Sequence, residues 1–289
     1  MAFCKKRNRG GQSGVKPRKR WGQHFLVDRA ALAPILSAAE LDRKDIVVEV
    51  GPGLGILTVE LAKRVSRVIA VEIDSRLIEV LRERLGGFSN LKLVHCDILQ
   101  VSPEELVKSN LEGSQLRRRY KVVANLPYYI TSPILRHFLE TELRPARMVI
   151  MVQKEVGELI AASPGDMGFL SVMVQFYSKP TIVAYVPATS FYPPPRVDSV
   201  ILRLDVYSQP PIAVSDVAGF FDFVKHGFSN PRKQLRNSLA HSLQMVHSDV
   251  VLLLEKAGID PRRRAETLSL EEWGKLWDVF LSLKQGSPC

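Results

Sequence analysis

Cysteine is scarce in this sequence. Its three cysteines, Cys4, Cys96 and Cys289, lie far apart and match no metal-ligand spacing. They are too few for a disulfide framework, so we expect a reducing compartment and no metal site. The chain also lacks any run of about 18 apolar residues, and its N-terminus lacks the apolar core of a secretory signal. These absences predict a soluble, cytoplasmic protein without a membrane partner.

Acidic residues are in the minority, with 30 Asp and Glu against 40 Lys and Arg, a formal net charge of +10. Such a balance favours a polyanionic partner, most often nucleic acid. The first 27 residues contain no acid, and their eight basic residues are interspersed with Gly10, Gly11 and Gly14. We interpret residues 1–20 as a flexible basic arm that contacts phosphates, with a plain disordered tail and a targeting peptide as alternatives. The candidate phosphate contacts in it are Arg18, Lys19 and Arg20.

Short β-rich runs alternate with helix-like stretches in the first two thirds of the chain. This alternation predicts an α/β domain over residues 21–208, with a largely parallel sheet covered on both faces. The last three runs have little helix between them, which predicts an antiparallel hairpin at the end of the sheet. The predicted strands are residues 46–50, 67–73, 91–97, 121–125, 147–153, 171–178, 181–186 and 199–206.

The apolar spacing becomes helical after the segment 209–214. We therefore expect a small all-helical domain over residues 209–289. The sequence contains no internal repeats, and a monomer is the expected state.

Three glycines, Gly51, Gly53 and Gly55, lie between a predicted strand and a predicted helix in "EVGPGLG". Their backbone allows a ligand to approach closely, although a purely structural turn is the alternative. A dinucleotide fingerprint requires a third glycine where Ile56 stands, and no Gly-Lys-Ser/Thr follows, so a nicotinamide dehydrogenase and a P-loop protein are both disfavoured.

Two acids are predicted at the ends of the next strands. Glu72 is placed where a carboxylate can accept both hydroxyls of a ribose, and Asp97 where an acceptor can meet the amine of adenine. Asp74 and Asp97 could equally cap the following helices. Together with the glycines, these acids predict a ligand that carries adenosine but no pyrophosphate.

The segment "NLPY", residues 125–128, ends the next predicted strand at the same edge. If the Asn125 side-chain oxygen and the Leu126 carbonyl each accept one N–H of an adenine N6 amine, the nitrogen lone pair is aimed outward. Pro127 stiffens this loop and Tyr128 offers a stacking face for a flipped base. Phe191, before a run of three prolines, is the candidate for the opposite face.

The sequence resembles the ribosomal RNA adenine N6,N6-dimethyltransferases, and in particular the small-subunit enzymes. The matching segments cover about residues 20–275: "GQHFL", "EVGPGLG", "VEID", "HCDIL", "NLPY", "FYPPPRVDS", "RKQLRNSL" and "RRAETLSLEEW".

The resemblance implies a Rossmann-like methyltransferase domain that uses S-adenosyl-L-methionine, followed by a C-terminal helical domain. It implies donor contacts from His24, Leu26, Gly51, Glu72, Asp97 and Asn125. The implied substrate is a pair of adjacent adenosines in a hairpin loop near the 3′ end of small-subunit rRNA, in the pre-30S particle. Three positions depart from the family pattern: His24 and Tyr129 stand where asparagine is frequent, and Pro231 interrupts a basic run. These departures concern the detail of substrate positioning and not the reaction.

Basic runs also occur outside the donor motifs. Arg232, Lys233 and Arg236 are candidate RNA contacts, and we expect Lys233 and Arg236 to share one helical face. Two alternative functions stay open: a large-subunit rRNA methyltransferase of the macrolide-resistance type, and a ribosome-assembly or nucleic-acid-binding factor without catalysis.

Overall fold

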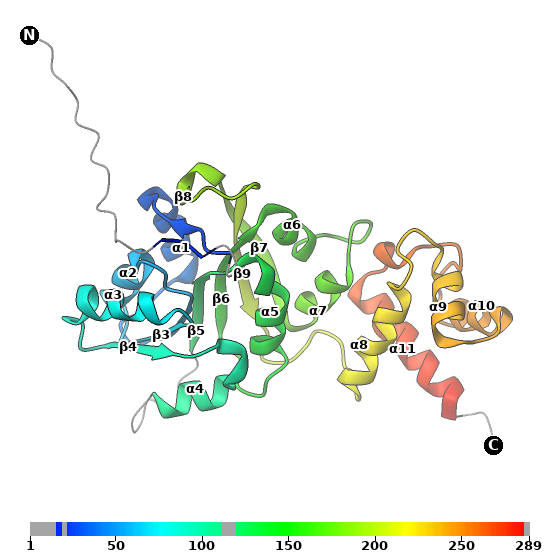
Figure 1. Ribbon diagram of the computed structural model, residues 1–289. Helices are drawn as coiled ribbons and strands as arrows, with labels where there is room; N and C mark the ends of the chain where they lie inside the picture. The colour runs from blue at the N-terminus through cyan, green and yellow to red at the C-terminus, as the bar shows by residue number, and fades with distance from the viewer. Residues whose placement is uncertain (1–15, 19–21, 111–119, 286–289) are drawn as a thin grey trace, which may run out of the picture. The chain divides into compact units, whose positions relative to one another are not determined.

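A computed structural model describes residues 16–18, 22–110 and 120–285 of the chain (Figure 1). Contacts divide the chain into two compact units. The first contains the described residues up to Pro145 together with Val149–Val152 and Val186–Asp198. The second contains Ala146–Met148, Gln153–Tyr185 and the described residues from Ser199 onward. In the ranges that the structure describes, no helix has the length and apolar character needed to cross a membrane.

The main sheet has seven strands in the order β4-β3-β2-β5-β6-β9-β7. β2 pairs in parallel with β3 on one side and with β5 on the other, so the strand order reverses between β2 and β5. Ligands of open α/β sheets bind at the carboxyl ends of the strands beside such a reversal. The strands are β2 (Ile46–Val50), β3 (Arg67–Glu72), β4 (Leu91–His95), β5 (Lys121–Asn125), β6 (Arg147–Gln153), β7 (Ser178–Val186) and β9 (Ser199–Val206).

The burial of each strand follows its place in the sheet. Every residue of β2 is buried, as expected for a parallel strand covered on both faces. The edge strand β7 instead alternates between exposed and partly buried residues, because successive side chains point to opposite faces of the sheet and one face is more exposed than the other. The end of β9 meets the beginning of β7 through the Tyr207 N–H, which donates to the Tyr177 carbonyl at 2.9 Å. The antiparallel hairpin predicted for this end of the sheet is thereby confirmed.

One predicted strand is wrong. Residues 171–178 belong mainly to helix α7 (Phe169–Tyr177), which begins after Gly168. The Gly168 N–H donates to the Ser171 hydroxyl at 2.8 Å and helps to fix the start of this helix. Most of α7 is buried, so its residues are apolar on nearly every side, and a short apolar run of this kind cannot be assigned to helix or strand by periodicity.

The helices cover the sheet in the first unit and dominate the second. In the first unit α2 and α3 contact β3, and α1 contacts β5 (Figure 1). The helices there are α1 (Leu32–Ala39), α2 (Ile56–Ala62), α3 (Ser75–Leu85), α4 (Pro103–Ser109) and α5 (Thr131–Leu139). Those of the second unit are α6 (Lys154–Ile160), α7, α8 (Val217–Gly227), α9 (Leu235–Leu243), α10 (His247–Lys256) and α11 (Leu270–Gln285). The helices α8 to α11 bear out the C-terminal helical region predicted from the sequence.

Gly55 stands where the fold leaves no room for a side chain. Its φ of +81° lies in the left-handed region, and a Cβ there would come within 2.9 Å of Leu81 and 3.0 Å of Leu85. Gly55→Ala should therefore lower the free energy of unfolding by about 2–4 kcal/mol, because backbone strain and overpacking add. Gly87→Ala is the matched control, since no atom lies within 4 Å of its Cβ position. Equal stability of the two variants in denaturant titrations would contradict the prediction.

Candidate active site

A cavity opens in the first unit where β2, β3 and β5 end. Five sequence segments meet there, and most of them are motifs singled out in the sequence. The cavity is lined by Gly22–Leu26, Glu49–Leu54, Ile56, Leu57, Val71–Ile73, Leu77, Cys96–Leu99 and Asn125–Ile130.

The glycine loop contributes two of its three glycines to the cavity. Gly51 and Gly53, with φ values of +68° and +58°, lie in its lining. Gly55 does not: it begins α2 and packs beneath the side chains of Leu81 and Leu85. The loop therefore has two roles. Gly51 and Gly53 form part of the cavity wall, and Gly55 allows the start of α2 to pack closely against α3.

Glu72 is the last residue of β3, one residue before the predicted end of the strand, and is only 5% exposed. One carboxylate oxygen accepts hydrogen bonds from the Ile73 and Asp74 N–H groups, both at 3.0 Å. The other oxygen is 3.4 Å from the Gly53 N–H. Burial raises the pKa of Glu72, and these backbone hydrogen bonds oppose that shift. A carboxylate fixed in this way is suited to accept ribose hydroxyls at the cavity wall.

Asp97 lies two residues beyond the end of β4, so the predicted strand was two residues too long. Its side chain accepts a hydrogen bond from the Leu99 N–H at 3.0 Å and caps a short 3-10 helix, η3 (Ile98–Gln100). The residue also lines the cavity. Asp97 therefore has the capping role that its sequence position allowed and a place from which it can contact a ligand.

Asn125 ends β5, and the following residues turn into the 3-10 helix η5 (Tyr128–Ile130). The Leu126 N–H donates to the Met151 carbonyl at 3.1 Å, which anchors this corner to β6. The Pro127 carbonyl accepts from the Ile130 N–H at 3.1 Å. The Asn125 amide nitrogen is 3.5 Å from the His24 carbonyl, and this contact directs the amide oxygen to the opposite side of the planar group.

His24, in "GQHFL", contacts both "NLPY" and the proline run of "FYPPPRVDS". Its Nδ1 lies 2.6 Å from the Pro193 carbonyl, and since a carbonyl can only accept, Nδ1 carries the hydrogen. Its ring stacks on Tyr128 with centroids 5.8 Å apart and an interplanar angle of 22°. The sequence did not predict this stacking, which depends on tertiary packing.

Phe191 is not brought into the cavity. It is 3% exposed, absent from the lining, and pairs with Leu26 between the short strands β1 (Phe25–Leu26) and β8 (Phe191–Tyr192). In this structure His24, and not Phe191, is the ring next to Tyr128.

Glu49 is a site residue that was not predicted from the sequence. It is the fourth of the five residues of buried β2, is 1% exposed and lines the cavity. Burial raises its pKa to about 8, with the nearby Thr58 hydroxyl opposing and the charge of Glu72 adding to the shift. One of its carboxylate oxygens is buried without a hydrogen-bond partner. The sequence contained a signal for this role. A glutamate inside the apolar run "IVVEV" is expected to be buried, and a buried carboxylate needs a cation or a hydrogen-bond donor as partner.

The candidate RNA contacts lie in several places. Arg232 and Lys233 are exposed, and the partly buried Arg236 donates to the Gln234 side chain at 3.0 Å. The prediction that Lys233 and Arg236 share a helical face is wrong, because α9 begins only at Leu235. The chain turns at Asn230, whose carbonyl accepts the Lys233 N–H at 2.9 Å, before the helix starts. Of the three candidates in the basic arm, Arg18 lies beside Asp74, whereas Lys19 and Arg20 lie outside the described residues.

Fold and site together define a Rossmann-like methyltransferase. The comparisons with known proteins give the particular family. The family model for ribosomal RNA adenine dimethylases matches residues 14–281. The chain belongs to this family and is an rRNA adenine dimethyltransferase.

Two curated relatives show how closely the chain resembles individual members. It is 50% identical over 277 residues to the ribosomal RNA small subunit methyltransferase A of Dehalococcoides mccartyi, covering 95% of this chain and 91% of the relative. It is 48% identical over 268 residues to the protein of the same name from Moorella thermoacetica, covering 92% and 93%.

Two solved structures share the fold. A dimethyladenosine transferase from Plasmodium falciparum has a TM-score of 0.74 at 26% identity, with 90% of this chain and 98% of that chain covered. The 23S rRNA methyltransferase ErmE has a TM-score of 0.69 at 29% identity, with 88% and 98% covered.

Proposed function

We propose that the protein dimethylates the N6 amines of two adjacent adenosines in a hairpin loop near the 3′ end of small-subunit rRNA. It would act as a cytoplasmic monomer on the pre-30S particle, with S-adenosyl-L-methionine as donor, and so contribute to small-subunit biogenesis. The observation that carries the proposal is the meeting of the Asn125–Tyr128 corner, the glycine loop and Glu72 around one cavity. The curated relatives named as small-subunit enzymes support the choice of substrate.

The cavity fits the proposed donor. Glu72 would accept the ribose hydroxyls, Asp97 the adenine amine, and Gly51 and Gly53 allow close approach of the ligand. The unpartnered carboxylate oxygen of Glu49 is suited to the donor's cationic ammonium group. His24, Leu26 and Asn125 would complete the contacts, with Gly55 acting through packing. When bound, the donor supplies an electrophilic methyl group on a sulfonium.

The corner at the end of β5 would activate the adenine amine by geometry. The Asn125 side-chain oxygen and the Leu126 carbonyl each accept one N–H, so the nitrogen lone pair is directed toward the methyl group. Pro127 holds the loop rigid and the Tyr128 ring stacks on the base. As the N–C bond forms, the bond between the methyl group and sulfur would break, which leaves a neutral thioether, and the nitrogen would release one proton to solvent. After the first methyl transfer the nitrogen has one N–H left. In the second transfer only one of the two acceptors can therefore form a hydrogen bond to it.

Phe191 is our proposed second stacking face. Because its ring is buried outside the cavity in this structure, that role requires the ring to move when RNA binds. His24 stands where asparagine is frequent in the family, and its ring now stacks on Tyr128. For the adenine base to stack on that face of Tyr128, the His24 ring would have to move aside or leave part of the face open.

The proposal is tested with labelled donor and separately prepared, unmethylated small and large ribosomal subunits. We expect dimethyladenosine in the small-subunit RNA after nucleoside analysis. Label confined to the large-subunit RNA would instead support the function of the structural neighbour ErmE. Binding to the small subunit without any transfer would support a non-catalytic assembly factor.

We further propose that the chain is divided by function into the basic arm 1–20, the methyltransferase domain 21–208 and an RNA-recognition domain 209–289. The exposed Arg232 and Lys233 would contribute phosphate contacts in the last of these. Replacing both by glutamine should weaken RNA binding and reduce the slope of log K against log[salt] by about 2, one for each phosphate contact.

Arg43→Gln is the control for that experiment, since Arg43 is an exposed arginine of the first unit. An unchanged salt slope in the double variant would show that these two side chains do not contact the RNA backbone.

A further inference from the structure

Asp74, the second acid of "VEID", has no role in the donor site described so far. Its side chain is fully buried and does not line the cavity. It caps α3 by accepting the Arg76 N–H at 3.2 Å, and it pairs with the Arg76 guanidinium at 2.6 and 3.0 Å. Burial alone would raise the pKa of Asp74, but the hydrogen bonds from Arg76 and Gln23 hold it below its usual range.

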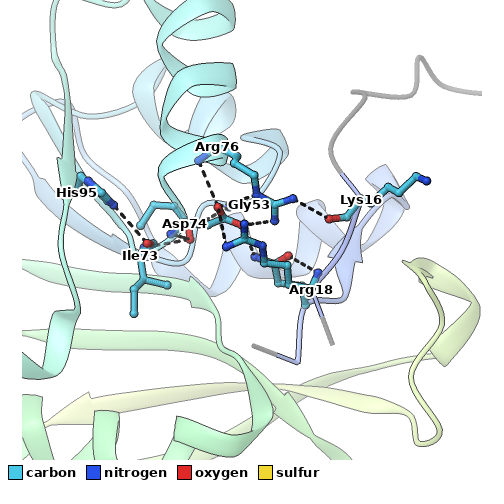
Figure 2. Close-up of polar contacts among 9 residues, drawn as sticks. Lys16, Arg18, Gly53, Ile73, Asp74, Arg76 and His95 are labelled. Atoms are coloured by element: carbon cyan, nitrogen blue, oxygen red, sulfur yellow. Dashed lines mark hydrogen bonds and ion pairs between the residues drawn. The ribbon is translucent and has the colours of Figure 1, made fainter. Parts of the chain in front are cut away.

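The same carboxylate also holds the N-terminal segment. The Gln23 side chain donates to Asp74 at 3.3 Å and accepts the Arg18 N–H at 2.8 Å. The Arg18 guanidinium lies 4.0 Å from Asp74, and Arg76 donates to the Lys16 carbonyl at 3.4 Å. Figure 2 shows Lys16 and Arg18 beside Asp74 and Arg76. Residues from two distant parts of the sequence are thus joined through one buried acid.

This cluster adjoins two walls of the donor cavity. Gln23 belongs to the segment Gly22–Leu26, which lines the cavity together with Glu72. On the other side, the Asp74 N–H donates to the Glu72 carboxylate at 3.0 Å. A helix cap needs one acceptor, whereas a buried charge that also binds a side chain from a second segment fixes where that segment lies.

We propose that Asp74 is a positioning residue for the methyl donor, which acts through Gln23 to hold the Gly22–Leu26 wall against the Glu72 corner of the cavity. Donor binding and order in this wall are then coupled. The proposal rests on the proposed donor site. It predicts that the Gln23–Asp74 bond affects donor affinity rather than the rate of transfer.

The experiment measures binding of S-adenosylhomocysteine to the full-length protein by calorimetry, for wild type, Gln23→Ala, Asp74→Ala and the double variant. Gln23→Ala leaves the Asp74–Arg76 cap intact and should weaken binding about tenfold, the effect of losing one hydrogen bond to a charged group. The double variant should bind no more weakly than Asp74→Ala alone, because the two residues act through the same bond. Asp216→Ala, which removes the cap of α8 in the second unit, is the control and should bind like wild type.

Two further measurements separate positioning from a merely structural role. In Gln23→Ala the KM for the donor should rise about tenfold while kcat at saturating donor stays within about twofold. Hydrogen exchange in residues 22–26 should be slowed by S-adenosylhomocysteine in wild type and not in Gln23→Ala.

Wild-type affinity in Gln23→Ala, or independent and additive effects of the two substitutions, would overturn the proposal while leaving the donor site intact. Failure of wild type itself to bind S-adenosylhomocysteine would overturn the proposed function as well. If Asp74→Ala does not fold, Gln23→Ala alone decides the question.

Discussion

Asn125→Ala should lower the rate of methyl transfer by at least about 100-fold while RNA binding is largely retained. The amide oxygen lost in this variant is one of the two acceptors proposed for the adenine amine, and alanine cannot replace it. Most of the RNA affinity would come from basic side chains elsewhere, which the substitution does not touch. The measurements are single-turnover transfer to unmethylated small subunits and RNA binding at fixed salt.

Asn110→Ala serves as the control, because that amide donates to the Leu106 carbonyl at the end of α4 and lies outside the cavity. It should leave transfer near the wild-type rate. Unchanged turnover in Asn125→Ala would remove this residue from the proposed mechanism, and equal losses of transfer and RNA binding would indicate a structural role.

Glu49→Gln should stabilise the protein without donor and, at the same time, weaken donor binding at least about thirtyfold. The affinity is lost because the buried carboxylate proposed to pair with the donor's ammonium is replaced by a neutral amide. Stability is gained because Glu49 must either take up a proton or bury a charge when the protein folds, and glutamine does neither. The opposite signs of the two effects distinguish a functional acid from one that merely supports the fold.

The gain in stability should depend on pH in a defined way. The Glu49 pKa is raised from 4.5 to about 8, so between these values the folded protein binds one proton more than the unfolded chain. Wild-type stability therefore falls as pH rises through this window, at about 1.4 kcal/mol per pH unit, whereas the glutamine side chain of the variant does not titrate.

Denaturant titrations should show no difference below about pH 4.5, a difference that grows to on the order of 5 kcal/mol at pH 8, and a constant difference above it. Glu79→Gln, which changes an exposed acid of α3, is the control. A difference that does not vary with pH would show that Glu49 is not held protonated by burial.

The sequence predicted the strands best where most of the strand is buried. β2, β5, β6 and β9 have the predicted bounds. A short run rich in β-branched residues between glycine, proline or polar residues favours a strand of that length. It failed at α7, where burial of most of the helix removes the periodicity that would identify it. The error at Lys233 has a different cause, since a turn at Asn230 delays the start of α9.

The candidate site was predictable to the extent that it depends on the sheet. Carboxyl ends of parallel strands meet at one edge, so Gly51, Glu72 and Asn125 had to lie close together once the strands were assigned. The stacking of His24 on Tyr128 and the burial of Phe191 depend on how separate loops pack, and no local pattern encodes that. Asp97 was predictable only in part. Its position at the end of a strand was expected, but the sequence could not decide between capping the next helix and contacting the ligand, and the structure is compatible with both roles.

The two outer strands of the sheet, β4 and β7, each place a lysine on the surface, Lys92 and Lys179, and β7 adds a proline at the next position. A further strand that docked against either border would bring these charges close to those of a second copy, and Pro180 offers it no N–H to bond. Both edge strands of the sheet thus carry residues that disfavour edge-to-edge aggregation. This matters for a protein that must bind its RNA and not other copies of itself.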